Sequence, residues 1–268
     1  MRQDRALVVL PCYNERENLQ KLVEQILSLE LELDVLVIDD ASPDGTGQIA
    51  EELKERFEQV EVLHRPGKLG LGTAYRAGFQ HALERGYERV VTMDADFSHQ
   101  VKYLGALVEG AKTAQLVIGS RYTAGGGAVG WPLVRRIISG TANRLARAVL
   151  GVSARDCTSG YRCYQSDALR VVDPESVLSS GYSFLVEMLY RIERSGLEVV
   201  EVPIVFVERQ AGGSKISRIE VYKTLYTLGR LRLPWLPWRW VAMVGGHFSE
   251  RSAVVSVGVV AASLWLLL

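Results

Sequence analysis

The sequence lacks several features that mark whole classes of protein. Its three cysteines, Cys12, Cys157 and Cys163, are too few and too scattered for a disulfide framework. They also form no Cys-x-x-Cys pair or Cys/His cluster of the kind that binds zinc. Lysine plus arginine equals aspartate plus glutamate at 31 each, so overall charge gives no indication of a nucleic-acid partner. The cysteine usage favours reduced thiols in a cytosolic domain.

Long hydrophobic runs are missing until the last residues. The first run, Ala6–Leu10, has the length of one strand, so we expect no secretory signal. Ala253–Leu268 carries no charge and would span about 24 Å as a helix, slightly less than a bilayer core of about 30 Å. We interpret this run as a short anchor, a truncated membrane region or a terminal core helix. Its lack of a polar face disfavours a core helix.

The first half of the chain alternates short apolar runs with segments of helical periodicity. Alternation of this kind predicts a parallel sheet with right-handed crossovers, and nearly all-apolar strands predict helices on both faces. The predicted strands are Ala6–Leu10, Asp34–Ile38, Val60–Leu63, Arg89–Met93 and Leu116–Gly119.

The second half is less regular. "TAGGGAVG" at 123–130 predicts a loop, and the apolar stripe from Val134 to Val149 predicts a helix whose stripe faces inward. "DCTSGYR" at 156–162 predicts a polar connection, and Glu198–Val207 predicts an extended segment. We expect a catalytic domain over 1–215, with no boundary before about residue 215.

Residues after 215 have the composition of a membrane surface segment. Trp235, Trp238 and Trp240 cluster beside two prolines, as interfacial aromatic residues do, and basic residues outnumber acidic ones. We expect a membrane-interface segment over 216–248 and an anchor over 249–268. The alternative for the first part is an ordinary amphipathic helix packed on the domain.

Acidic residues follow several predicted strands. "VVTMDADFSH" at 90–99 places Asp94 and Asp96 directly after a strand, while "PCYNE" and "DDASPDGT" follow the first two strands. The carboxyl ends of parallel strands meet at one edge of a sheet, where ligands bind. The sequence therefore predicts an acidic site at this edge.

A divalent cation would relieve the repulsion between two such close carboxylates. Mg²⁺ or Mn²⁺ commonly bridges carboxylates to substrate phosphates, which suits a sugar-nucleotide transferase. Asp-x-Asp alone also occurs as two solvated acids or in an aspartate-nucleophile phosphatase. The phosphatase reading is disfavoured because the later strand ends in "GSRY", without acids.

Eight ordered segments resemble one family. They are "VVLPCYNERENL", "VLVIDDASPDGT", "LGLGTAY", "MDADFSH", "GSRY", "GWPLVRR", "DCTSGYR" and "GGSK". Over about residues 6–232 the chain resembles the polyprenyl-phosphate (dolichyl-phosphate) mannose synthases, which are inverting family 2 glycosyltransferases of the GT-A fold. The resemblance implies an α/β fold with a Rossmann-like, mostly parallel sheet covered by helices. It is less specific for the sugar, because relatives that move glucose share several segments.

The resemblance implies a role for particular residues. The implied donor contacts are Pro11, Tyr13, Glu15, Asp39, Asp40, Lys68, Asp94, Ala95, Asp96 and Arg121. Asp39 has the alternative of capping a turn, and Lys68 that of a solvated loop lysine.

Metal and acceptor contacts are implied in the same way. The implied metal ligands are Asp94, Asp96 and Ser98, and Ser98 stands where some relatives carry a glutamine, a better ligand. The implied acceptor phosphate contacts are Arg135, Arg209 and Lys215, and the implied catalytic residues are Asp96, Arg121 and Arg135. The arginines have the alternative of surface ion pairs, and Arg136 can trade roles with Arg135.

The reaction expected from the resemblance is transfer of mannose from GDP-mannose to a polyprenyl (dolichyl-type) phosphate with inversion. A phosphate monoester has a second pKa of about 6, so this acceptor needs no general base. The alternatives are a UDP-glucose-dependent enzyme and a non-catalytic membrane scaffold. The basic flank before the apolar run predicts a catalytic domain on the cytosolic face of a membrane, the plasma membrane in a prokaryote or the ER membrane in a eukaryote.

Overall fold

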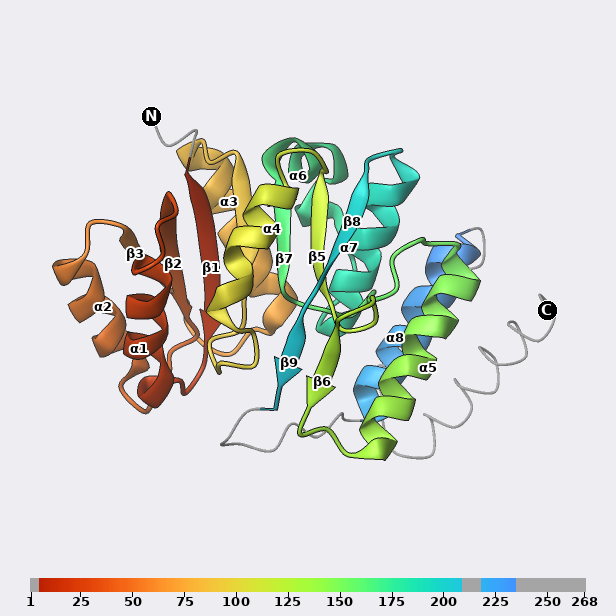
Figure 1. Cartoon of the computed structure of the whole chain (residues 1–268), viewed down its shortest axis with the longest axis horizontal. Coiled ribbons are helices and arrows are strands. Elements are labelled where there is room, and N and C mark those ends of the chain that lie inside the picture. The colour runs from red at the N-terminus through yellow and green to blue at the C-terminus, as the bar shows by residue number, and fades with distance from the viewer. Residues whose placement is uncertain (1–4, 209–217, 235–268) are drawn as a thin grey trace.

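The computed structural model describes residues 5–208 and 218–234. A seven-stranded sheet forms the centre, in the order β3-β2-β1-β4-β7-β5-β8 (Figure 1). All of its neighbouring strands pair in parallel except β7, which is antiparallel to β4 and β5. The strands are β1 (Ala6–Cys12), β2 (Leu33–Asp39), β3 (Val60–His64), β4 (Arg89–Thr92), β5 (Leu116–Ser120), β7 (Arg162–Gln165) and β8 (Val199–Pro203).

The five strands predicted in the first half and the mostly parallel sheet are confirmed. The strand β7 was not predicted, because its first residue, Arg162, ends the polar run "DCTSGYR" and its residues do not stand out as an apolar segment. In the sheet, β7 lies between β4 and β5 and runs antiparallel to both.

Helices cover both faces of the sheet, as the apolar strands predicted. Alternate residues of β1 separate the two cores, with Leu7 and Val9 on one face and Val8 and Leu10 on the other. Helices α1, α2 and α4 pack on the second face, while α3, α6 and α7 pack on the first. The helices are α1 (Arg16–Leu27), α2 (Thr46–Arg56), α3 (Leu71–Arg85), α4 (Leu104–Gly110), α5 (Leu133–Leu150), α6 (Ser166–Val172), α7 (Tyr182–Arg194) and α8 (Arg218–Arg232).

A second, two-stranded sheet lies at the lower edge of the view in Figure 1. Its strands, β6 (Gly127–Val129) and β9 (Val205–Val207), pair in parallel. The extended segment predicted over Glu198–Val207 is therefore β8 followed by β9, with the buried Ile204 between them. Part of the glycine-rich segment predicted as a loop is the strand β6.

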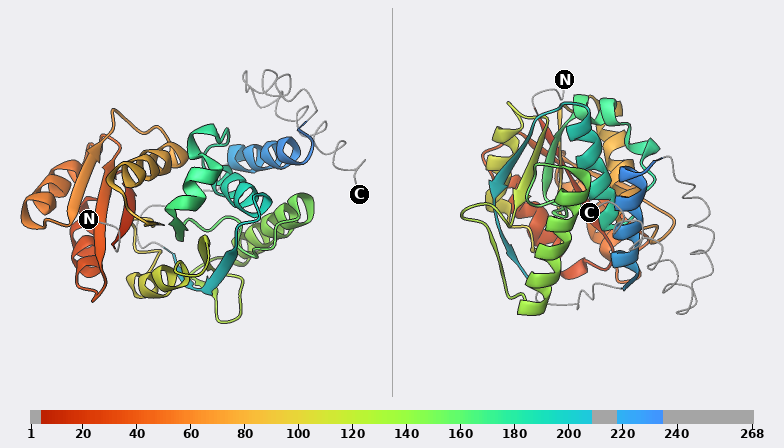
Figure 2. Two further views of the ribbon diagram at one scale, coloured as in Figure 1. Left: turned by 90° about the horizontal axis from the view of Figure 1, so that it is seen from above. Right: turned by 90° about the vertical axis from the view of Figure 1, so that its right-hand side faces the viewer.

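Helices α5 and α8 lie side by side at one end of the molecule (Figure 2). The prediction that the apolar stripe of α5 faces inward is wrong for its first half, because Val134 is 67% exposed and Ile137 58%. By contrast, Leu228 of α8 is fully buried and packs in the core. Within residues 5–208 and 218–234, no helix is both long and apolar enough to cross a bilayer. The predicted anchor over 249–268 and the second half of the interface segment lie outside the described residues.

Candidate active site

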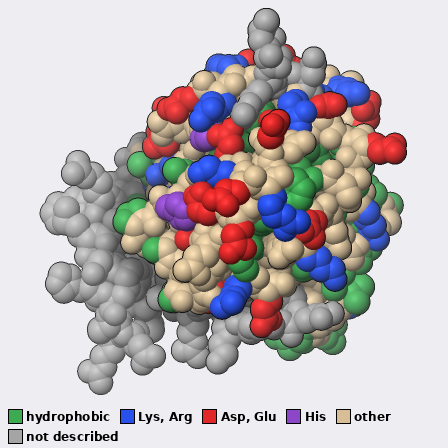
Figure 3. All heavy atoms as spheres, turned by 90° about the vertical axis from the view of Figure 1, so that its left-hand side faces the viewer, with side chains coloured by type: hydrophobic (Ala, Val, Ile, Leu, Met, Phe, Trp, Pro, Cys, Tyr) green, Lys and Arg blue, Asp and Glu red, His purple; other side chains and the backbone are tan. Residues whose placement is uncertain are grey.

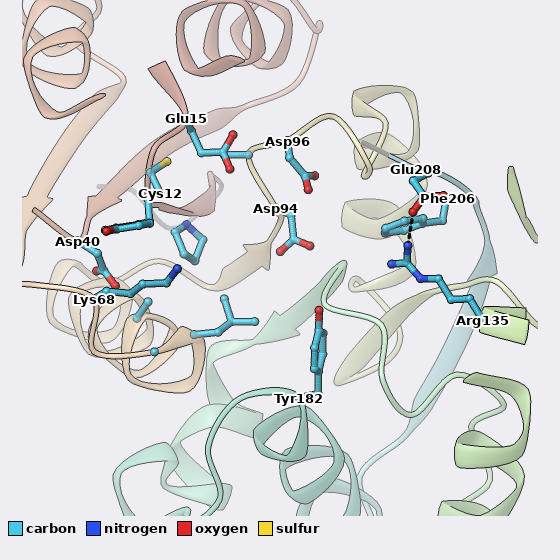
Figure 4. Close-up of a pocket in the computed structure, with 16 residues that line it drawn as sticks. Cys12, Glu15, Asp40, Lys68, Asp94, Asp96, Arg135, Tyr182, Phe206 and Glu208 are labelled. Atoms are coloured by element: carbon cyan, nitrogen blue, oxygen red, sulfur yellow. Dashed lines mark hydrogen bonds and ion pairs between the residues drawn. The ribbon is translucent and has the colours of Figure 1, made fainter. Parts of the chain in front are cut away.

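A hollow of about 330 Å³ opens at the carboxyl ends of β1, β2 and β4 (Figure 4). Strand order changes direction between β1 and β4, and ligands bind at such points in open α/β sheets. We call this space the acidic hollow. Its lining comprises Pro11, Cys12, Tyr13, Glu15, Asp40, Lys68, Gly70, Leu71, Ala74, Asp94, Ala95, Asp96, Arg135, Tyr182, Phe206 and Glu208.

The turn after β4 presents both of its acids to the hollow (Figure 4). The backbone N–H of Ser98 donates to Asp96 Oδ1 over 3.0 Å, and the backbone N–H of Asp94 donates to His99 Nδ1 over 3.0 Å. His99 is buried and stacks on the Tyr161 ring, with ring centroids 4.8 Å apart. Burial lowers the pKa of His99 although Asp94 and Asp96 oppose this, so the neutral ring accepts at Nδ1. These contacts therefore fix the conformation of the turn.

These two carboxylates suit an open cation site. Among the described residues, no group of three or more Asp, Glu, His or Cys side chains forms a complete metal site. Mg²⁺ and Mn²⁺ commonly take one or two carboxylates and complete their coordination with water and substrate phosphates. The third expected ligand, Ser98, is buried, and its hydroxyl has no hydrogen-bond partner among the described atoms.

The two acids at the end of β2, Asp39 and Asp40, differ in whether they line the hollow. Asp40 lines the hollow, and Arg65 donates to both of its carboxylate oxygens over 2.6 Å. Asp39 does not line the hollow. Its carboxylate accepts from the Ser42 backbone N–H and lies 3.5 Å from His64, as expected of the turn-capping alternative. Arg65 was not predicted as a site residue, although it directly follows β3 and so reaches the same edge of the sheet.

Lys68 and Tyr13, two of the expected donor contacts, also meet in the hollow. The Lys68 Nζ atom lies 4.2 Å from the centre of the Tyr13 ring. The ring attracts the ammonium group and keeps it at the mouth of the hollow, where it can meet an anion.

Arg121 forms an ion pair with the buried carboxylate of Asp156. Its guanidinium donates to both oxygens of Asp156, over 2.7 and 2.6 Å, and to the Thr158 hydroxyl over 2.8 Å. Burial opposes ionisation of Asp156, but Arg121 outweighs it and lowers the pKa of that carboxyl. Arg121 lines a second hollow and not the acidic one.

Arg135 lies where the two hollows meet. It belongs to the first turn of α5, its Nη1 donates to Glu208 Oε1 over 2.5 Å, and its guanidinium lies 4.3 Å from the Trp131 ring centre. The ion pair with Glu208 is drawn in Figure 4. Together with the contact to the Trp131 ring, it fixes the direction of the guanidinium.

The second hollow, of about 410 Å³, is mostly apolar, and we call it the apolar hollow. It extends from Asp94 and Arg135 between α5 and α8. Its remaining lining comprises His99, Arg121, Trp131, Ile137, Ile138, Ser139, Thr141, Ala142, Leu145, Thr158, Ser159, Gly160, Tyr182, Phe206, Thr224 and Leu225.

The structure thus brings together most of the expected site. Of those residues, Pro11, Tyr13, Glu15, Asp40, Lys68, Asp94, Ala95, Asp96 and Arg135 line the acidic hollow. Arg209 and Lys215, the other expected acceptor contacts, lie outside the described residues.

Comparisons with known proteins agree with this fold. The chain is 49% identical over 213 residues to the undecaprenyl-phosphate mannosyltransferase of Micrococcus luteus, covering 80% of this chain and 88% of that one. It is 44% identical over 224 residues to the polyprenol monophosphomannose synthase of Mycolicibacterium smegmatis, covering 83% and 84%.

A solved structure shares the fold at lower identity. It is the glucosyl-3-phosphoglycerate synthase from Mycobacterium tuberculosis in complex with Mn²⁺, UDP and glucosyl-3-phosphoglycerate. The TM-score is 0.62 at 19% identity, covering 85% of this chain and 80% of that one. In addition, residues 7–172 match the profile described as glycosyl transferase family 2. Together with the two relatives at 44% and 49% identity, this match shows that the chain belongs to glycosyl transferase family 2.

Proposed function

We propose that this protein transfers mannose from GDP-mannose to a polyprenyl phosphate, giving polyprenyl-phosphate β-mannose and GDP. One observation carries the proposal: an acidic hollow and an apolar hollow meet at Asp94 and Arg135. A charged donor fits the first hollow, and a phosphate on an apolar chain fits the second. The names of the Micrococcus luteus and Mycolicibacterium smegmatis relatives support mannose and a polyprenyl acceptor.

The donor occupies the acidic hollow in this proposal. Glu15 and Asp40 accept hydrogen bonds from base N–H groups or ribose hydroxyls, and Arg65 fixes the Asp40 carboxylate for this task. Asp94 and Asp96 hold a divalent cation, Mg²⁺ or Mn²⁺, with Ser98 as a weaker third ligand. Such a cation, when bound, neutralises charge on the leaving diphosphate.

The acceptor reaches the site from the apolar hollow. Ile137, Leu145 and Leu225 line that hollow and can contact the lipid chain, while Arg135 at its inner end meets the phosphate. Because the phosphate is largely dianionic at neutral pH, one of its oxygens attacks the anomeric carbon without a general base. The bond from that carbon to the diphosphate oxygen breaks, GDP leaves, and in-line attack inverts the anomeric centre.

The main barrier is repulsion between two anions, and fixed positive charge lowers it. Arg135 is pre-oriented by Glu208 and Trp131, so little reorganisation is needed when charge develops. Arg121 lines the apolar hollow, where its positive charge is paired with the Asp156 carboxylate. We retain Arg209 and Lys215 in the proposal as further phosphate contacts.

The exposed start of α5 supports membrane association. Leu133 and Val134 are 72% and 67% exposed, and Ile137 and Ile138 follow on the next turn. The opposite side of the molecule, over α1 and α2, instead carries interspersed acidic and basic side chains (Figure 3). Ion pairs such as Lys54–Glu51 belong to that side. We therefore place the α5 end against the cytosolic face of a membrane, where a lipid phosphate enters the apolar hollow directly.

A lipid-extraction assay tests this function. The full chain is incubated with Mg²⁺, one polyprenyl phosphate and radiolabelled GDP-mannose or UDP-glucose, and label in the organic phase is counted. We expect label from GDP-mannose only, and calorimetry with Mg²⁺ should show tighter binding of GDP than of UDP. Label from UDP-glucose alone would favour the glucose alternative, and nucleotide binding without transfer would favour a scaffold.

A further inference from the structure

The Tyr75 hydroxyl is a buried polar group that takes no part in the contacts described above. Tyr75 lies on α3 and is fully buried, and its ring packs against Phe79 and Phe184, with centroids 6.3 and 6.4 Å away. Its hydroxyl oxygen has no hydrogen-bond partner among the described residues. A buried hydroxyl without a partner destabilises a fold, and phenylalanine would give the same packing without that cost. The oxygen therefore needs an explanation beyond packing.

The hydroxyl lies directly behind the acidic turn after β4. A side chain on Gly160 would begin 3.1 Å from the Tyr75 hydroxyl oxygen and 3.8 Å from Asp94 Oδ1. Both oxygens thus face the same small space, which the missing side chain of Gly160 leaves open. Gly160 itself is fixed, because the Thr92 hydroxyl donates to its carbonyl over 2.7 Å.

The two groups are complementary. The phenol of Tyr75 carries an O–H donor, and the Asp94 carboxylate accepts hydrogen bonds. The Asp94 side chain is 38% exposed and lines both hollows. His99 cannot serve Asp94 as a side-chain donor at Nδ1, because that nitrogen already accepts from the Asp94 backbone. Tyr75 is placed to add a donor on the side of this carboxylate that faces Gly160.

We propose that Tyr75 is a positioning residue, whose hydroxyl donates to the Asp94 carboxylate when the nucleotide donor and its cation are bound. The hydrogen bond would fix the rotamer of Asp94 and leave its other oxygen for the cation. This role rests on the proposed function, since it assumes that Asp94 serves a donor-bound cation. Without nucleotide and cation, the hydroxyl has no hydrogen-bond partner among the described residues and destabilises the fold. The hydrogen bond formed when they bind would offset that destabilisation.

Removing one oxygen tests the role. For the full chain with Tyr75→Phe we expect an unchanged or higher Tm without ligand, because an unpartnered hydroxyl is lost. In the presence of GDP, we expect Mn²⁺ binding, followed by the EPR signal of free Mn²⁺, to weaken about 10-fold, as is typical of lost second contacts to metal ligands.

Tyr87→Phe is the matched control. Tyr87 is also fully buried, but its hydroxyl donates to Asp34 Oδ2 over 2.7 Å, and neither residue lines the hollow. This variant should lower Tm and leave Mn²⁺ binding unchanged, the opposite pattern.

The outcomes separate the two claims. If Tyr75→Phe binds Mn²⁺ with GDP as wild type does, the Tyr75 role is wrong and the proposed function stands. A loss of Tm like that of Tyr87→Phe would show that the hydroxyl already has a partner in the unloaded protein and would also overturn the role. Wild type that binds no Mn²⁺ with GDP would refute the proposed function and the Tyr75 role with it.

Discussion

Asp40 and Arg65 form a buried, two-pronged ion pair at the edge of the acidic hollow, with both N···O distances at 2.6 Å. Arg65 is further held by the Thr73 hydroxyl over 2.8 Å, so the Asp40 carboxylate has a single direction. A fixed acceptor of this kind favours recognition of a nucleoside, because little conformational freedom is lost on binding.

Arg65→Lys is expected to weaken GDP binding with Mg²⁺ roughly 10- to 100-fold, which corresponds to about 1.5–3 kcal/mol for a lost charge-assisted bond. Lysine keeps the charge but cannot reproduce the planar fork that orients Asp40. Isothermal titration of the variant and wild type with GDP measures the change. Equal affinities would show that the orientation of Asp40 does not matter for the nucleotide.

Asp96→Asn should remove most transfer activity while leaving the fold intact. The amide oxygen can still accept from the Ser98 backbone N–H, but the ligand charge is lost. Because a bound cation contributes on the order of several kcal/mol to transition-state stabilisation, we expect kcat/KM to fall at least about 100-fold. Asp167→Asn, at an exposed position on α6, is the control. Wild-type activity that survives EDTA would rule out the role of Asp96 as a metal ligand.

Membrane binding is expected to depend on α5 as well as on the C-terminal run. Deleting Ala253–Leu268 should release the protein only partly, since basic residues after 217 attract anionic lipid at about 1 kcal/mol each. Adding Val134→Ser and Ile137→Ser should reduce flotation with liposomes further. The control is Val171→Ser, which changes an equally exposed residue on α6. Equal flotation with anionic and neutral liposomes would contradict the electrostatic part of this account.

The buried carboxylate of Glu187 predicts a pH-dependent stability. It lies on α7 and accepts from Ser179, Arg191 and, across the helix interface, Arg230 of α8. Burial raises its pKa, but Ser179 and the two arginines outweigh this and lower the pKa below its ordinary value of 4.5. The resulting stability is therefore present above about pH 4.5 and lost as the pH falls through the lowered value.

Glu187→Gln should thus lower the free energy of unfolding by about 1.5–3 kcal/mol near neutral pH. The difference in free energy of unfolding between the variant and wild type should narrow below pH 4.5, where the wild-type carboxyl becomes protonated. Urea unfolding of both proteins at several pH values measures it. A gap that is constant with pH would show that the Glu187 charge does not stabilise the packing of α7 and α8.

Local patterns were sufficient to predict most of the sheet and the acids at its edge. Apolar runs such as Ala6–Leu10 identify parallel strands, and the residues that follow them must meet at the carboxyl edge. This reasoning placed Asp94 and Asp96 in one hollow. It could not distinguish Asp39 from Asp40, because the direction of adjacent side chains after a strand depends on the turn.

Long-range pairings were beyond such patterns. Arg121 and Asp156 are 35 residues apart, and only the packing of the fold brings them together. The polar run at 156–162 also conceals its last residue, Arg162, which begins β7. Arg162 is fully buried and donates to the carbonyls of Ser159, Cys157 and Leu185. The exposed stripe of α5 has the periodicity of a core helix, and its sequence alone does not show which surface it faces.

The central claim is that Arg135 stands between a donor hollow and an acceptor hollow and serves the acceptor phosphate. The direct measurement is kcat/KM for polyprenyl phosphate beside the Kd for GDP-mannose in Arg135→Ala. Arg136→Ala is the matched control, because Arg136 is adjacent and exposed, and it lines neither hollow. Loss of a charge-assisted contact predicts transfer slower by roughly 10- to 100-fold, with the Kd changed much less and only partial rescue by lysine. An equal loss of donor binding would place Arg135 in the donor site and contradict the account.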